Sequence, residues 1–459
     1  MRRPVCVVLS TLAVVFASAA ARADEPPILD LIALLPEDPT TYLSVPLFSY
    51  VDFRAVEAAA SVATPESESR FAGLPEAERM PWWDSLKRIV VGPPSIIQYA
   101  ARVGLHEKTS YDGTGPDWFA VDRAMAIWQA PPHGVTILGG DADMTEAEGF
   151  DFALPPRGFV NEDIDGVSVW HRFADNAFAS ALKDEAIEGD LFDDGLMTSL
   201  RLAVLPGQLI GSRSWHDLRA VLPVATGGAK AAPAAGLLRP MVEALGAVEG
   251  SDGPLVQAMA FSLVHVGLAE TGVDIIAGAL SAGGNVDLDG LAAGLQAAPS
   301  GPSLPAYPLV LFADIAAGND QINVIALPFA DRATAEAALG VLAGRLRLWQ
   351  PGSFKEPVLD VISGKVTTAV VDDERVAPAV AGTFRSVVLA ASAASGTTPD
   401  GAAAEPTEGI PAVPPGGAVA LVAIRYPLPV AGSDARPSAF FSIALQAIYT
   451  RDFAPLAVP

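Results

Sequence analysis

Residues 309–329 read LVLFADIAAGNDQINVIALPF, and this stretch predicts a β-hairpin. Residues 309–314 and 321–329 are runs of apolar and β-branched residues, which are typical of strands. Between them, Gly318, Asn319 and Asp320 are residue types that favour a tight turn. The second half of the chain is therefore expected to contain an antiparallel strand pair.

A helix is expected directly after this hairpin. Asp331 is a residue type that caps helix N-termini, and the predicted helix runs from there to Arg347. Apolar residues follow at spacings of three and four, as one face of a helix requires. They are Leu339, Leu342, Leu346 and Trp349. Strands followed by a helix in this way indicate the α+β class.

Further elements are predicted on both sides of this unit. Strand-like runs occur at residues 42–50, 135–138, 167–170, 200–205, 257–266, 358–362, 366–371, 386–389, 417–426 and 440–449. Helical spacing follows Asp52, occurs at residues 95–105, and recurs at 117–128, where Asp117 is the expected cap. A further helix is expected over residues 214–222, capped by Ser212 or Ser214.

Two parts of the chain share an order of elements. Residues 135–146 (VTIL…TE) and 324–335 (VIAL…TA) both pass from a strand into the start of a helix. We interpret this as internal duplication, with a chance similarity as the alternative. The predicted fold class is α+β, with two duplicated units that each pack helices on a mainly antiparallel sheet.

The composition along the chain suggests four regions. A signal peptide at residues 1–23 precedes an N-terminal α+β unit at 24–224. A connecting region at 225–305 contains an apolar core segment, and a C-terminal α+β unit covers 306–459. Within this last unit, residues 391–417 are rich in Ala, Ser, Thr, Gly and Pro, and we expect a mobile loop there.

The first 23 residues have the organisation of a secretory signal. Arg2 and Arg3 precede an apolar run, and the sequence Ala21-Arg22-Ala23 is a small-x-small cleavage pattern. A cleaved signal is expected rather than a retained anchor, and this predicts a bacterial protein that is periplasmic or secreted. The only cysteine, Cys6, lies in this segment, so the mature chain would contain no disulfide and no Cys-ligated metal.

The chain is strongly acidic. It contains 29 Lys plus Arg against 53 Asp plus Glu, a formal net charge of −24. Such a surface repels nucleic acids and anionic membranes, and neither is expected as a partner. The most apolar internal stretch, residues 255–283, is interrupted by His265, Glu270 and Asp274, so no transmembrane helix is expected in the mature chain.

No motif for catalysis or cofactor binding is found. The five histidines lie at least 27 positions apart (133 − 106 = 27), so no two can share a helix face as metal ligands. Ser214 lies in Gly-Ser-Arg-Ser-Trp, which lacks the second glycine of a nucleophile elbow, and we interpret it as a helix cap. No catalytic residue and no cofactor is therefore predicted.

The pattern Asn-x-Asp-x-Asp-Gly occurs twice and resembles the start of a calcium loop. The candidate ligands are Asn161, Asp163, Asp165, Asn285, Asp287 and Asp289. The twelfth position, where a calcium loop carries an acid, is Arg172 in one copy and Gln296 in the other. The alternative is that each Asp-Gly forms a tight hairpin turn.

Together these observations favour an exported, non-catalytic protein of the periplasm or envelope that binds a partner protein or a small ligand. The alternative is a secreted hydrolase, a glycosidase or peptidase, whose carboxylates no motif reveals. The pair Trp82-Trp83 would suit a sugar cleft, although core packing is the favoured interpretation. A third hypothesis is a protein that responds to cations.

Overall fold

The computed structural model describes residues 26–35, 47–65, 70–71, 73–86, 88–91, 118–128, 134–141, 147–175, 200–229, 235–262, 303–352, 354–381, 416–428, 438–449 and 453–456. Several predictions lie outside these residues. They are the signal peptide at 1–23, the helix at 95–105, the second calcium-loop candidate with Asn285, Asp287 and Asp289, the strand at 386–389, and nearly all of the loop at 391–417.

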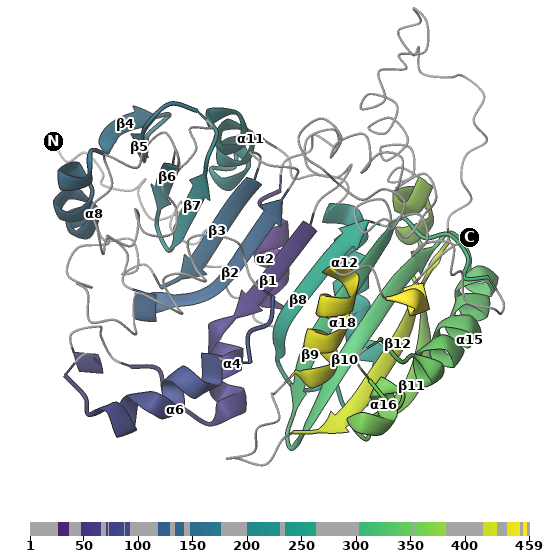
Figure 1. Cartoon of the computed structure of the whole chain (residues 1–459). Helices are drawn as coiled ribbons and strands as arrows, with labels where there is room; N and C mark the ends of the chain where they lie inside the picture. The colour runs from purple at the N-terminus through teal and green to yellow at the C-terminus, as the bar shows by residue number, and fades with distance from the viewer. Residues whose placement is uncertain are drawn as a thin grey trace, which may run out of the picture.

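The described strands form one antiparallel sheet of twelve strands, which crosses the molecule from β4 to β11 (Figure 1). The strand order is β11-β12-β10-β9-β8-β1-β2-β3-β7-β6-β5-β4. The strands are β1 Leu47–Asp52, β2 Val121–Trp128, β3 Gly134–Gly140, β4 Val160–Ile164, β5 Val167–Arg172, β6 Leu200–Leu205, β7 Gln208–Ser212, β8 Leu255–Ser262, β9 Leu309–Ala317, β10 Asp320–Phe329, β11 Lys365–Asp372 and β12 Ala418–Pro427.

Helices cover both faces of this sheet. On one face lie α4 Phe53–Ala60, α6 Glu76–Leu86, α8 Ala147–Ala153, α15 Arg332–Leu348, α16 Val358–Val361 and α18 Ala439–Tyr449. On the other face lie α2 Pro27–Ile32, α11 Trp215–Ala225 and α12 Ala235–Ala244. Each face carries its own apolar core, so the central strands are buried on both sides. The predicted α+β class is confirmed, and the described strands form one large antiparallel sheet.

The hairpin predicted at residues 309–329 is confirmed as β9 and β10. Ala317 pairs with Asp320, which leaves a two-residue loop whose first member, Gly318, has φ 62°. A positive φ at this position is required by the turns that match strand twist, and glycine adopts it without strain. Asp331 caps α15 as expected, because its carboxylate accepts a hydrogen bond from the Thr334 amide at 2.8 Å.

Most of the other predicted strands are also confirmed, as β1, β3, β5, β6, β8, β11 and β12. β8 belongs to the predicted connecting region at 225–305, yet it lies in the middle of the sheet between β1 and β9. The strands of both predicted units therefore belong to a single sheet. The helix at 214–222 is α11, and residues 440–449, expected as a strand, form the helix α18.

The predicted helix at residues 117–128 is wrong. A short 3-10 turn at Trp118–Ala120 leads into β2, which pairs with β1 on one side and with β3 on the other. Ala124, Met125, Ala126 and Ile127 are all buried, because both faces of β2 are covered. A strand buried on both faces shows no two-residue alternation, so the accidental spacing of its large residues resembled a helix.

The predicted strand at residues 358–362 is also wrong, because this segment forms the one-turn helix α16. Pro357 precedes it and accepts backbone hydrogen bonds from Asp360 and Val361. Its first two residues, Val358 and Leu359, are buried against the core on the α15 side. Tertiary packing therefore outweighs the strand preference of the β-branched residues.

Candidate binding site

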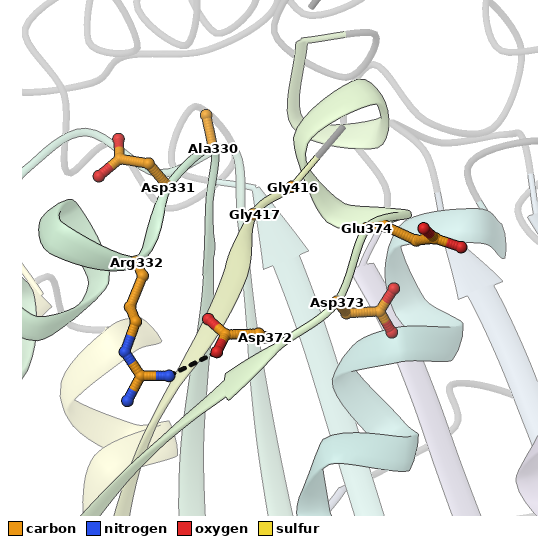
Figure 2. A pocket seen from close by; sticks show the side chains of 8 residues that line it. All are labelled: Ala330, Asp331, Arg332, Asp372, Asp373, Glu374, Gly416 and Gly417. Atoms are coloured by element: carbon orange, nitrogen blue, oxygen red, sulfur yellow. Dashed lines mark hydrogen bonds and ion pairs between the residues drawn. The ribbon is translucent and has the colours of Figure 1, made fainter. Parts of the chain in front are cut away.

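A cavity of about 590 Å³ opens where β10 and β11 end and β12 begins (Figure 2). Four of its five charged lining residues are acidic, and we call it the acidic pocket. It is lined by Ala330, Asp331, Arg332, Asp372, Asp373, Glu374, Gly416 and Gly417. Three separate segments of the chain contribute to it, and the sheet brings them to one edge.

Asp331 lies at the N-terminus of α15, where its carboxylate is already in use. It accepts hydrogen bonds from the amide and the hydroxyl of Thr334, both at 2.8 Å. The hydrogen bond from the backbone amide of Thr334, together with that from its hydroxyl, lowers the pKa of Asp331. The carboxylate is therefore anionic across the neutral range and adds negative charge to the pocket.

Arg332 and Asp372 form an ion pair across one side of the pocket. The guanidinium Nη1 lies 2.5 Å from the Asp372 carboxylate, and Nε lies 2.7 Å from Glu336 one turn along α15. Figure 2 shows Asp372 turned toward Arg332, whereas Asp373 and Glu374 point to the other side. The carboxylates of this acidic run therefore do not converge on one point.

Asp373 belongs to a second ion-pair chain that ties the sheet to α12. Arg375 binds both Asp373 and Glu243, and Glu243 also accepts from Arg239 at 3.0 Å. Hydrogen bonds from Arg375 lower the pKa of Asp373. Burial raises the pKa of Glu243, but its hydrogen bonds to Arg375 and Arg239 outweigh burial, and the net pKa is lowered.

The floor of the pocket depends on two glycines. Gly416 accepts a hydrogen bond from the Ala377 amide at 2.9 Å, and Gly417 has φ 121°. A β-carbon at Gly417 would lie 2.5 Å from the Ala377 nitrogen and 3.0 Å from the Val376 side chain. Only glycine permits this close approach, which holds the acidic run against the start of β12.

The chemistry of the acidic pocket suits attraction of a cation rather than proton transfer. A general acid needs a raised pKa, whereas the pKa values of Asp331 and Asp373 are lowered. Among the residues that the structure describes, no group of three or more His, Asp or Glu side chains could hold a metal ion. An ammonium or guanidinium group of a ligand matches this surface best.

A second polar cluster lies deep in the core and centres on Asp314, which is fully buried. Its carboxylate accepts from Asn323 at 3.1 Å, from Gln257 at 2.8 Å and from Ser438 at 2.6 Å, and also from Gln321. These partners come from β8, β10 and the start of α18. We interpret the cluster as a structural clamp, because these donors already occupy the hydrogen-bonding capacity of the Asp314 carboxylate.

The first calcium-loop candidate forms a hairpin turn. Ile164 pairs with Val167, and the two loop residues Asp165 and Gly166 both have positive φ, at 54° and 84°. These angles are those of the type I′ turn that Asp-Gly favours. The Asp163 carboxylate accepts from the Gly166 amide at 3.0 Å. Calcium binding stays a prediction, tested by a rise in melting temperature with calcium that a chelator reverses.

Asn161, the remaining member of this copy, is exposed on β4, and its side-chain oxygen accepts from the Ser168 hydroxyl at 3.1 Å. Ser214 caps α11 and accepts from the His216 amide at 3.0 Å, as expected of a structural residue. Trp82 is buried, with its ring centroid 5.1 Å from that of Phe71. It therefore belongs to the core.

Sequence reasoning missed the acidic pocket. The run Asp372-Asp373-Glu374 directly after a predicted strand was the available signal, and Asp331 was identified only as a cap. In the part of the chain with described coordinates, no helix combines the length and the apolar character needed to cross a membrane. Comparison of the chain with protein-family models, curated proteins and solved structures finds no match in any of the three.

Proposed function

We propose that this is an exported, non-catalytic protein of the periplasm or envelope, and that it binds a partner or small ligand through a cationic group. The observation that carries the proposal is the open acidic pocket, in which three segments bring four carboxylates together where β10 and β11 end and β12 begins. The acid excess of the whole chain, 53 against 29 basic residues, would attract such a ligand from a distance.

Calorimetric titration with a tri-arginine peptide tests the binding. We expect binding to the native chain and at least about tenfold weaker binding to an Asp372→Asn/Glu374→Gln double variant. The matched control is Glu162→Gln/Asp163→Asn on β4, which removes the same formal charge at the opposite edge. Equal weakening by both double variants would show that net charge alone attracts the peptide, and would refute the pocket as the site.

Export is tested separately. Arg2, Arg3 and the cleavage pattern that ends at Ala23 support a secretory signal. When the chain is expressed with its own N-terminus in a Gram-negative bacterium, we expect a periplasmic product whose first residue is Asp24. Recovery of the intact chain from the cytosol alone would contradict this part of the proposal.

A hydrolase remains the alternative, but the pocket chemistry favours binding. A glycosidase needs two carboxyl groups that face each other across the substrate, one of them protonated at working pH. In the acidic pocket, Asp372 is paired with Arg332, and Asp373 is paired with Arg375, which lowers its pKa. The lowered pKa of Asp373 does not suit donation of a proton to a leaving group.

A duplicated unit is part of the same proposal. Going outward from the antiparallel pair β1–β8, one direction contains β1, β2, β3 and then β7. The other direction contains β8, β9, β10 and then β12, so the two directions share one order. A helix follows the third strand each time, α8 after β3 and α15 after β10, on the same face. Among the described strands, the β4–β5 hairpin has no counterpart in the second direction.

A further inference from the structure

The two edge strands of the sheet, β4 and β11, lie on opposite sides of the molecule (Figure 1) and differ in length and charge. β4 has five residues and carries Glu162 and Asp163, both exposed. β11 has eight residues, KVTTAVVD, with a single charge at each end and no proline. Natural proteins usually protect edge strands by shortness, charge, bulges or proline, because a free edge is a template for another strand. β4 has such protection and β11 does not.

The register shows which groups of β11 face outward. The amide of Asp373 donates to the Gly417 carbonyl at 3.0 Å, and Asp373 continues the pairing of Asp372 with Ala418. In an antiparallel pair, hydrogen-bonded and non-hydrogen-bonded residues alternate. The residues whose N–H and C=O groups point away from β12 are therefore the even-numbered ones. They are Val366, Thr368, Val370 and Asp372.

We propose that β11 pairs with β11 of a second copy of this chain, antiparallel across a two-fold axis, so that the two sheets continue into one. Strand addition of this kind gains its affinity from main-chain hydrogen bonds. Among the described strands none pairs with the outer side of β11, and Thr367 and Thr368 are exposed there. A two-fold axis makes the contact self-complementary, as closed dimers require.

Charge selects one register of this pairing. The residues whose N–H and C=O groups point outward must pair with the same kind of residue in the second copy, so the two-fold axis passes through a residue of β11 and not between two residues. An axis at Ala369 places Lys365 opposite Asp373 of the second copy. This attraction occurs twice, in pairs that are not hydrogen-bonded and whose Cα atoms are only about 4.5 Å apart. An axis at Val370 would instead place Lys365 opposite Arg375. The basic start and acidic end of this edge therefore favour a second, antiparallel copy.

Two of the remaining cross-strand pairs in this register bring β-branched side chains together. Thr367 faces Val371 of the second copy, and Thr368 faces Val370. Pairs of β-branched side chains stabilise antiparallel contacts. This inference does not rest on the acidic pocket taking a foreign ligand, although Asp373 lies in both the pocket and the proposed contact.

Light scattering on eluting protein, over a wide concentration range at physiological salt, tests the proposal. We expect the native chain to shift from one mass to twice that mass as concentration rises. Thr368→Pro removes an outward amide without deleting a bond to β12, since proline is tolerated on the free side of an edge strand. We expect the dimer to be lost in this variant, while its circular dichroism and tri-arginine binding stay native.

The matched control is Asn161→Pro on β4. Glu162 and Ile164 lie in hydrogen-bonded pairs with β5, since Ile164 closes a two-residue hairpin, so the Asn161 amide also points outward. This control should dimerise as the native chain does. As a measurement without any variant, amide hydrogen exchange at Val366, Thr368 and Val370 should slow as the dimer forms.

Three results would overturn the proposal. They are a native chain that stays monomeric at every concentration, a dimer that Thr368→Pro leaves intact, or slow exchange at the outward β11 amides already in the monomer. The last result would mean that a segment of the same chain occupies the edge. A native chain that dimerises but does not bind tri-arginine would count against the proposed function only.

Discussion

At the scale of single residues, the core of the second half depends on Asp314. Its carboxylate is fully buried and accepts hydrogen bonds from side chains of β8, β10 and α18, and the Arg88 Nε lies 3.9 Å away. A buried charge costs much free energy unless hydrogen bonds compensate it, and removing it leaves its buried donors without a partner. The residue should therefore be far more sensitive to substitution than any exposed acid.

We predict that Asp314→Ala lowers the free energy of unfolding by about 3–5 kcal/mol, in the range seen when one member of a buried charged network is removed. Asp320→Ala is the matched control, since Asp320 lies 3.6 Å from Arg425 and its side chain is 38% exposed. Its cost should stay below about 1 kcal/mol. Both values come from urea denaturation, and similar costs for the two variants would contradict the clamp.

Three buried tyrosines give a prediction for alkaline pH. Burial raises the pKa of Tyr50, Tyr307 and Tyr426 well above the ordinary value of about 10. Their folded-state pKa values exceed the unfolded ones, so their contribution to stability is complete below about pH 10 and is lost as pH rises through the folded values.

In an alkaline titration followed by phenolate absorbance, these three tyrosines should ionise only as the chain unfolds. Tyr307→Phe should remove one equivalent from the late, cooperative phase. Ionisation of these three tyrosines near the free value of about pH 10, while the chain is still folded, would contradict their burial.

At the scale of helices and strands, side-chain caps stabilise the N-termini of helices. Ser214 precedes α11 and accepts from the amides of His216 and Asp217. We predict that Ser214→Ala lowers the free energy of unfolding by about 1 kcal/mol, because two amides lose their acceptor. Ser214→Thr keeps the hydroxyl and should restore most of the loss. An equal cost for the two variants, measured by denaturant unfolding, would show that packing around Ser214, and not its hydroxyl, is what matters.

The elements that sequence reasoning predicted correctly are those with local signals. Gly318 determines the β9–β10 turn, and Asp331 determines the start of α15. Both elements can therefore be recognised from a few neighbouring residues in the sequence. β2 was predicted wrongly because its burial comes from the apolar cores on both faces of the sheet, which are built largely from elements far away in the sequence. Long-range pairing overrides local spacing in such strands.

The acidic pocket could not be predicted for a related reason. Asp331, Asp372 and Gly417 are far apart along the chain, and the register of β10, β11 and β12 is what brings them together. Each residue has an adequate local explanation, as a cap, as the end of a strand or as a turn. Residues with such separate local roles form no sequence motif, so the site can be recognised only from the register of the strands that brings them together.

At the scale of the whole molecule, one long sheet carries the surplus of negative charge. The formal net charge is −24, and like charges on a compact surface repel one another. Apolar cores on both faces of the sheet must hold the fold against this repulsion. Stability should therefore depend on ionic strength as well as on packing.

We predict that adding sodium chloride up to about physiological strength raises the melting temperature at neutral pH, because the screening length falls to about 8 Å and weakens repulsion between surface carboxylates. The same salt near the isoelectric pH, which the acid excess places in the acidic range, is the control. There the net charge is close to zero, so salt should change the melting temperature little or lower it by screening ion pairs such as Arg332–Asp372. Equal salt stabilisation at both pH values would mean that salt acts through general strengthening of apolar burial, and that the surplus charge does not limit the stability of the fold.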